Sequence, residues 1–341
     1  MRYFTLLIII ISSCILPLDA GVKWKDGRWI DTAENPSLYS DEHYKIACEE
    51  FNCGKWKDAA KHFRIITCNY ANSEYGPNAA FFLGICEFHL CEYEDANKAL
   101  NCYLRHRTDS THFFEAIEYK FCIADIYANG HKRRLFCYNT LPKLVPGYSY
   151  AIEVYDEIIF ALPNHEMAAQ ALFSKATLLA WLGNYRESVD TYQVFLRRFP
   201  KHSLAPECYV NIINNYLWMA QTEYQNPDLL SFAQLTYIKF AKVFPRDENL
   251  PVAQALVMDV KETYASGFYE LGRYYERSGW DRAAAIYYNA CAEQFPDTNI
   301  AARSRDKLAY LGWLLPPAAT AKVSAEIEDN SNCIPSDIEF D

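Results

Sequence analysis

The stretch from residue 183 to residue 200 is GNYRESVDTYQVFLRRFP, and its spacing decides the fold. Gly183 and Tyr185 are followed by a small residue, Ser188, by an aromatic residue four positions later, Tyr192, and by Pro200. Residues four apart share one face of a helix, so this small and aromatic pair lets a second helix approach closely and fills the space beside it. Glycine suits the turn before the helix, and proline stops it. The stretch therefore predicts the second helix of an antiparallel helix pair.

The same pattern recurs along the chain, which indicates a repeat architecture. Small anchor residues at the position of Ser188 are 37, 55, 37, 45 and 51 residues apart, and they are Ala59, Ala96, Ala151, Ser188, Ala233 and Ala284. Small residues also recur in the preceding helices, at Ala47, Gly84, Ala176 and Gly272. A single helix pair cannot bury its apolar face alone, so such pairs stack on one another. The pattern resembles the tetratricopeptide repeat, which implies an all-α tetratricopeptide-repeat α-solenoid of about six helix pairs with almost no strand.

The domain organisation follows from this periodicity. Residues 21–40 form a lead-in segment, and residues 41–315 form the solenoid, with insertions near 106–146 and 246–262. Beyond residue 316 the periodicity ends and acidic residues outnumber basic ones, which is typical of an acidic disordered tail over 316–341.

The first 20 residues have the pattern of a signal peptide. Arg2 precedes an almost wholly apolar run from Phe4 to Leu18, which is too short to span a bilayer comfortably. Two outcomes stay open. The peptide is cleaved after Ala20, or residues 11–14 act as a bacterial lipobox and Cys14 carries a lipid anchor. Both outcomes predict an exported protein.

Composition excludes several classes of function. The chain has 341 residues, 33 Lys and Arg against 43 Asp and Glu, and a formal net charge of −10, so it lacks the basic surface that nucleic-acid binding requires. No glycine-rich phosphate loop and no G-x-S-x-G motif is present. His165-Glu166 begins an H-E-x-x-H motif, but position 169 is alanine, so the second zinc ligand is missing. We expect no catalytic residues and no cofactor.

Cysteine is abundant, with 12 residues, and the densest group is Cys86, His89 and Cys91. Neither interval in this group is a usual zinc-ligand spacing, and Cys86 and Cys91 point to different sides of one helix. We therefore expect no metal site. In an oxidising compartment some cysteines could pair, but the sequence does not give the connectivity.

Roughly residues 41–313 resemble a narrower family, most specifically at the last repeat. Residues 269–298, which end in Phe295-Pro296-Asp297-Thr298, resemble the last repeat of the BamD family (also called ComL), and residues 44–105 resemble its first two repeats. These proteins are outer-membrane assembly lipoproteins of Gram-negative bacteria. The resemblance implies a non-catalytic adaptor at the periplasmic face of the outer membrane. Its implied partners are the periplasmic domain of a BamA-like β-barrel insertase and unfolded outer-membrane protein precursors. The alternative is another periplasmic repeat scaffold, a cell-division or peptidoglycan coordinator like YbgF.

Two surfaces are candidate binding sites. In tetratricopeptide folds the first helix of each pair lines a groove, and the repeat phase aligns three residues of one unit with three of the next: Phe173, Thr177 and Trp181 with Val210, Asn214 and Trp218. Two aligned tryptophans could hold a peptide, because aromatic residues dominate binding hot spots. The alternative is that both tryptophans pack against the neighbouring unit.

The second surface is the last repeat, which in the resembled family holds the insertase. Arg273 and Arg277 are one helical turn apart, beside Tyr274 and Trp280, and this combination suits an acidic partner. The alternative is that the arginines are merely solvated and Trp280 packs in the turn.

Overall fold

The computed structural model describes residues 22–25, 28–31, 38–105, 111–134, 142–222, 226 and 228–313. The predicted signal peptide with Cys14, and the predicted acidic tail, lie outside these residues. The chain divides into two compact units, Met1–Ser174 and Lys175–Asp341, and each is described by itself.

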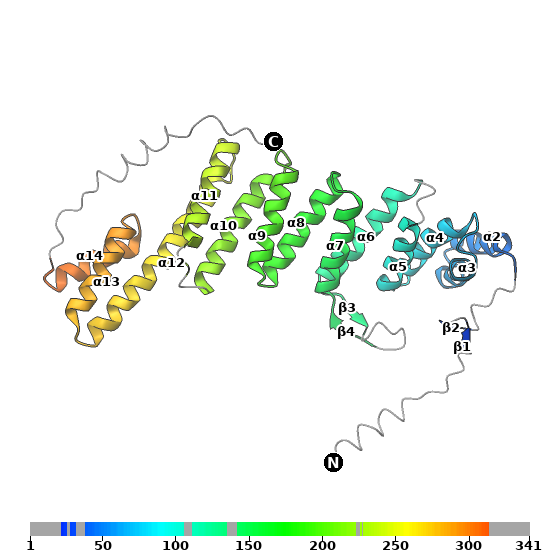
Figure 1. Cartoon of the computed structure of the whole chain (residues 1–341), viewed down its shortest axis with the longest axis horizontal. Coiled ribbons are helices and arrows are strands. Elements are labelled where there is room, and N and C mark those ends of the chain that lie inside the picture. The colour runs from blue at the N-terminus through cyan, green and yellow to red at the C-terminus, as the bar shows by residue number, and fades with distance from the viewer. Residues whose placement is uncertain are drawn as a thin grey trace, which may run out of the picture. The chain divides into compact units, whose positions relative to one another are not determined.

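The first unit contains three helix pairs (Figure 1). Its helices are α2 (Ser40–Asn52), α3 (Trp56–Asn69), α4 (Gly76–His89), α5 (Tyr93–Arg105), α6 (Phe113–Ala128) and α7 (Tyr148–Ala161). Within each pair the two helices pack on one another, and α3 also packs on α4. Two short antiparallel hairpins accompany them: β1 (Val22–Lys25) with β2 (Arg28–Asp31), and β3 (Lys132–Arg134) with β4 (Lys143–Pro146).

The second unit continues the helix pairs. Helix α8 (Glu166–Trp181) begins in the first unit and ends in the second. It is followed by α9 (Tyr185–Arg198), α10 (Ala205–Thr222), α11 (Asp228–Val243), α12 (Leu250–Arg277), α13 (Asp281–Gln294) and α14 (Asn299–Tyr310). The described residues thus form six helix pairs and a last helix, α14, which packs on α12 and α13. The all-α prediction is confirmed.

The anchor residues of the repeat pattern lie where helices meet. All six are fully buried: Ala59, Ala96, Ala151, Ser188, Ala233 and Ala284. In the first pair, Ala47, Ala59 and Phe63 belong to one apolar cluster. The phase of the repeats, deduced from small and aromatic residues, is therefore confirmed.

Two glycines in first helices show how closely the helices approach. A Cβ atom at Gly84 would lie 2.7 Å from the side chain of Leu100, and one at Gly272 would lie 2.6 Å from the ring of Tyr288. Leu100 and Tyr288 are each four residues beyond an anchor alanine. The small residue in the first helix therefore makes room for the large residue in the second.

Where the structure describes the whole turn between two paired helices, the turn contains a left-handed residue. Gly183, between α8 and α9, has φ +83°, a conformation that glycine adopts without strain. The corresponding position between α4 and α5 is Cys91, with φ +60°. Here a residue with a Cβ atom takes the glycine conformation, which costs about 1–2 kcal/mol.

The two segments predicted as insertions contain regular structure. Segment 106–146 includes α6, which is the first helix of the third pair, so the additional element within that pair is the β3–β4 hairpin between α6 and α7. Segment 246–262 contains the beginning of α12, which at 28 residues is long enough to serve both as a connection and as the first helix of the sixth pair.

Candidate functional site

A groove in the second unit collects many of the predicted binding residues. Its volume is about 380 Å³, and it is bordered by the end of α8, by α9 and by α10. The lining residues are Thr177, Ala180, Trp181, Tyr185, Tyr192, Asn211, Asn214, Asn215 and Trp218. We call it the tryptophan groove.

Helical spacing explains why these side chains converge. Thr177 and Trp181 are four residues apart at the end of α8, and Asn214 and Trp218 are four apart on α10. Residues at this spacing share a face, so each helix presents one polar and one aromatic side chain to the groove. Asn211 and Asn215 repeat the spacing on α10 and add two further carboxamides.

Both tryptophans are exposed rather than packed away. Trp181 is 68% exposed and Trp218 is 47% exposed. Burial of an indole ring is strongly favourable, so two exposed rings beside one groove are unusual for residues whose role is packing. The alternative that both tryptophans serve mainly to pack against a neighbouring unit is not supported by this exposure.

Hydrogen bonds fix the polar floor of the groove. The hydroxyl of Tyr192 lies 2.8 Å from Oγ1 of Thr177 and accepts a 3.2 Å hydrogen bond from Nδ2 of Asn211. Below it, Nδ2 of Asn215 donates to Oγ of Ser188 at 2.9 Å, and Ser188 donates to the carbonyl of Ala176 at 2.7 Å. The anchor serine of the repeat therefore also holds α10 against α8.

Burial is the main cause that raises the pKa of Tyr192 to about 12. The phenol is therefore neutral at physiological pH. A neutral hydroxyl both donates and accepts, so it can orient its neighbours without adding charge to the groove.

The structure brings together four of the six predicted groove residues. Thr177, Trp181, Asn214 and Trp218 border the groove, whereas Phe173 and Val210 are partly buried elsewhere and do not. Sequence reasoning missed five lining residues, which are Ala180 on α8, Tyr185 and Tyr192 on α9, and Asn211 and Asn215 on α10. The available signal was the repetition of asparagine at 211, 214 and 215.

The predicted docking residues lie at the junction of α12 and α13. Tyr274 is 64% exposed and Trp280 is 67% exposed, and Arg277 is also exposed. Nη1 of Arg273 lies 2.8 Å from Oε1 of Glu270 on its own helix. We call Tyr274, Arg277 and Trp280 the α12–α13 corner. Trp280 is thus not a packing residue of the turn, and Arg273 has an acidic neighbour already.

Residues 131–134 read His-Lys-Arg-Arg, and the two arginines of this basic run form ion pairs within the first unit. Nε of Arg133 lies 2.5 Å from Glu94, and Nη2 of Arg134 lies 2.5 Å from Glu92. Lys143 on β4 also contacts Glu92, at 3.4 Å, and donates to the carbonyl of Cys91 at 2.8 Å. The hairpin is thereby held against the start of α5.

The residues weighed for metal binding or catalysis have other surroundings. The ring of His89 stacks on Trp56 with centroids 4.3 Å apart, and Cys86 is fully buried whereas Cys91 is exposed. Nδ1 of His165 accepts a hydrogen bond from the backbone of Met167 at the start of α8. Within the described residues no group of three or more potential ligands could hold a metal ion.

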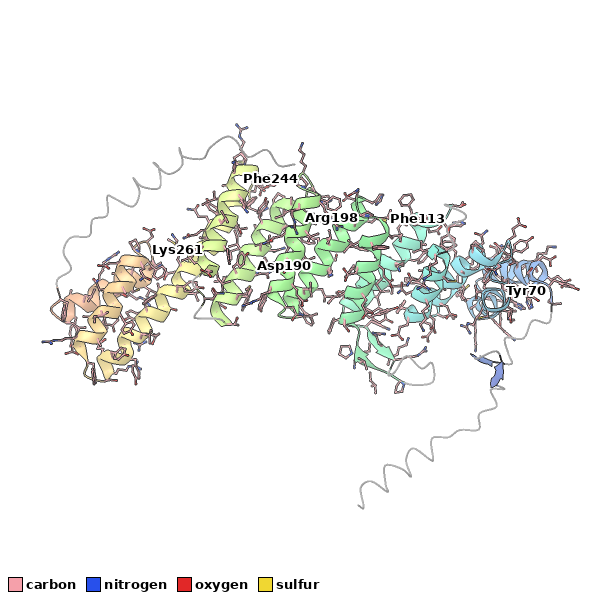
Figure 2. The ribbon with its side chains drawn as sticks, in the orientation of Figure 1. Tyr70, Phe113, Asp190, Arg198, Phe244 and Lys261 are labelled. Carbon is pink, nitrogen blue, oxygen red and sulfur yellow. The ribbon has the colours of Figure 1, made fainter. Side chains whose placement is uncertain are left out.

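Two other grooves in the second unit differ in chemistry. One, of about 400 Å³, is bordered by Asp190 and Arg186 of α9 together with α10 and α11. The other, of about 680 Å³, lies between α11 and α12 and includes Lys261, which is 3.9 Å from Asp297. Asp190 and Lys261 are labelled in Figure 2.

Across the described part of the chain, no helix has the length and apolar character needed to cross a membrane.

Comparison with known proteins agrees with the helix-pair pattern. A tetratricopeptide repeat family model matches residues 170–202, which cover most of α8 and α9. The chain has the all-α tetratricopeptide-repeat fold. No curated protein matches the sequence.

Solved structures give distant matches. A structure of MamA from AMB-1 is 15% identical, covers 63% of this chain and 96% of its own, and has a TM-score of 0.32. YrrB, described as a TPR protein with an unusual peptide-binding site, is 12% identical, covers 66% of this chain and 94% of its own, with a TM-score of 0.32. A tetratricopeptide repeat protein from Parabacteroides merdae is 13% identical, covers 80% and 98%, and also has a TM-score of 0.32.

Proposed function

We propose that this protein is a non-catalytic adaptor that binds an extended segment of another protein in the tryptophan groove. The observation that carries the proposal is the groove itself, where two exposed tryptophans flank a floor of fixed carboxamides and hydroxyls. Exposed aromatic rings supply contact area at low entropic cost, and carboxamides can pair with the peptide backbone. Protein binding is also the usual role of tetratricopeptide repeats.

A selection experiment tests this function. Random 12-residue peptides displayed on phage are selected on the whole protein, and the selected peptides are measured in solution. We expect Trp181→Ala or Trp218→Ala to weaken binding at least tenfold, as removal of a hot-spot residue does. Trp280→Ala is the matched control, because Trp280 is equally exposed but lies outside the groove. Undiminished binding to both groove variants would refute the proposal.

We further infer that the adaptor works in the bacterial cell envelope, as the resemblance of residues 269–298 to the BamD family implies. Its partners are then a BamA-like insertase and unfolded outer-membrane protein precursors. The exposed α12–α13 corner supports this assignment, because an arginine between two exposed aromatic side chains suits an acidic partner surface.

Charge reversal at the corner tests the partner. Arg277→Glu is the sharper variant, because Arg273 already neighbours Glu270; the double variant with Arg273→Glu extends it. We expect either variant to reduce co-purification of a BamA-like barrel from membranes, with Arg198→Glu at the end of α9 as the control. If the reversed protein still co-purifies undiminished, the docking assignment is wrong. If cell-division or peptidoglycan proteins co-purify instead, the YbgF-like alternative holds.

The membrane attachment has its own test. If Cys14 carries a lipid, Cys14→Ala releases the protein from membranes, because two or more acyl chains are what hold a lipoprotein stably. A mature N-terminus at Gly21 would establish ordinary cleavage of the signal peptide instead.

A further inference from the structure

The tryptophan groove has an aromatic wall made by three helices. Trp181 ends α8, Tyr185 begins α9, and Trp218 lies near the end of α10. The residues come from different elements, so the fold must be complete before they meet. An aromatic side chain on each of three helices around one opening is an arrangement that presents several π-electron faces to one ligand group.

Two of these rings are parallel. The ring planes of Tyr185 and Trp218 differ by 8°, and their centroids are 6.5 Å apart. Aromatic pairs in contact have centroids about 4.5–7 Å apart, so this pair lies near the upper limit. Both rings border the groove, and Trp218 is 47% exposed. A flat group that enters the groove can therefore lie against aromatic surface of matching orientation.

The other lining residues favour a flat ligand group that carries a positive charge. None of the described residues that line it is charged, and Asn211, Asn214 and Asn215 add carboxamide oxygens. The Nδ2 group of Asn211 already donates to Tyr192, which leaves the Oδ1 atom of Asn211 to accept from a ligand. Aromatic ring faces and carbonyl oxygens both carry negative electrostatic potential, which attracts a cation. The chain as a whole also has a net charge of −10.

We propose that the tryptophan groove selects protein segments that carry an arginine, whose guanidinium group stacks on Tyr185 and Trp218 and donates to the asparagine carboxamides. This inference rests on the proposed function and specifies its ligand. Guanidinium is planar, permanently charged and rich in donors, so it meets all three features of the groove at once. A lysine ammonium group lacks the flat face, and a phenylalanine ring lacks the charge and the donors.

Small-molecule probes test the proposed preference for arginine directly. The whole protein is titrated with the N-methylamides of Nα-acetyl-arginine, citrulline, lysine and phenylalanine, and binding is followed by the indole N–H resonances of its tryptophans. Citrulline is the decisive comparison, because it keeps the planar shape and loses the charge. We expect the arginine probe to shift the signals of Trp181 and Trp218 but not that of Trp280. It should bind about fivefold more tightly than the citrulline probe, the ratio that a cation–π contribution of about 1 kcal/mol gives.

Variants of the groove residues then show which side chains cause the preference for arginine over citrulline. Trp218→Leu and Tyr185→Leu keep an apolar side chain but remove the aromatic face, so each should abolish the preference for arginine over citrulline. Trp313→Leu is the control that should leave the preference unchanged, because Trp313 is 48% exposed and belongs to neither the tryptophan groove nor the α12–α13 corner. Far-UV circular dichroism verifies that each variant is folded. Equal binding of arginine and citrulline, or tighter binding of the phenylalanine probe, would overturn the inference, as would an arginine preference that survives both groove variants.

The two proposals fail differently. If phage selection yields peptides that depend on Trp181 and Trp218 but show no enrichment of arginine, the peptide-binding function stands and the arginine specificity is wrong. If the arginine probe binds as expected but no selected peptide depends on the groove, the specificity of the site stands and the adaptor function is wrong.

Discussion

Gly272 and Gly267 lie on the same helix, α12, in opposite circumstances. A Cβ atom at Gly272 would lie 2.6 Å from the ring of Tyr288, whereas a Cβ atom at Gly267 would meet nothing within 4 Å. Tyr288 is fully buried, so its ring cannot move aside freely. The two positions therefore separate the effect of close packing from the effect of helix propensity.

We predict that Gly272→Ala lowers the free energy of unfolding by about 1–3 kcal/mol, because it overpacks the contact with Tyr288. Gly267→Ala should instead raise it by about 0.5–1 kcal/mol, because alanine favours the helix. Urea unfolding of the two variants measures both values. Equal effects of the same sign would contradict the assigned contact between α12 and α13.

Cys91 shows that a repeat position can depart from its preferred residue. It has φ +60° at the position where three other turns between paired helices have Gly54, Gly183 and Gly279. We predict that Cys91→Gly stabilises the first unit by about 0.5–1 kcal/mol in urea unfolding, because relief of left-handed strain exceeds the added flexibility of the unfolded chain. Cys91→Ser is the control, since serine keeps the Cβ atom and should bring no gain. A gain for serine as well would assign the effect to the thiol instead.

At the scale of elements, the β3–β4 hairpin depends on ion pairs with α5. The side chains of Arg133 and Glu94 are 22% and 13% exposed, so their pairing is only partly screened by water. Arg133→Gln leaves the Glu94 carboxylate without its partner, and we expect a loss of about 1–3 kcal/mol in unfolding free energy. Lys98→Gln is the control, because the Lys98–Asp95 pair is exposed and should matter by less than about 1 kcal/mol. Equal effects of the two changes would show that the hairpin is not held this way.

The contact between α2 and α3 includes two histidines. Nδ1 of His43 lies 2.8 Å from Nδ1 of His62, and His43 is almost fully buried. Burial, followed by the charge of a protonated His62, lowers the pKa of His43 below its ordinary value of 6.5. The unfolded state therefore takes up protons before the folded state does, so the stabilising effect is complete above about pH 6.5 and is lost as the pH falls below it.

We predict that the urea midpoint of the first unit decreases between pH 7.5 and pH 5.5, and that His43→Phe makes this decrease smaller. His131, whose pKa is also lowered by burial and then by Lys143, contributes a further part of the slope with the same sign. His165→Asn is a suitable control, because it also removes a histidine but lies outside α2 and α3. An unchanged slope in His43→Phe would exclude His43 as a source of the pH dependence.

For the whole molecule, the repeats could be predicted because their contacts are local. Each anchor and its aromatic partner lie four residues apart, and the facing helix is the neighbour in sequence, so composition and spacing determine the contact. The β3–β4 hairpin could not be predicted in the same way. Its partners, Glu92 and Glu94, lie about 40 residues earlier in the chain, and the charged residues of so short a hairpin show no repeat spacing.

Part of the tryptophan groove could be predicted because its residues follow the repeat spacing. The repeat phase located Thr177, Trp181, Asn214 and Trp218, because they occupy equivalent positions on successive first helices. Tyr185 and Tyr192 belong to the repeat signature, so their second role at the groove is hidden in a structural pattern. Phe173 shares the register of Trp181 but lies two turns earlier on α8, away from the groove.

Helix α12 has a mechanical consequence. Its 28 residues span about 42 Å as one uninterrupted rod. It packs on α10, α11 and α13, and near its end it carries Tyr274 and Arg277 of the α12–α13 corner. A pull exerted by a partner at the corner is therefore transmitted along a single stiff helix to α10, which also carries Asn214 and Trp218. The α12–α13 corner and the tryptophan groove are thus connected through α12 and α10.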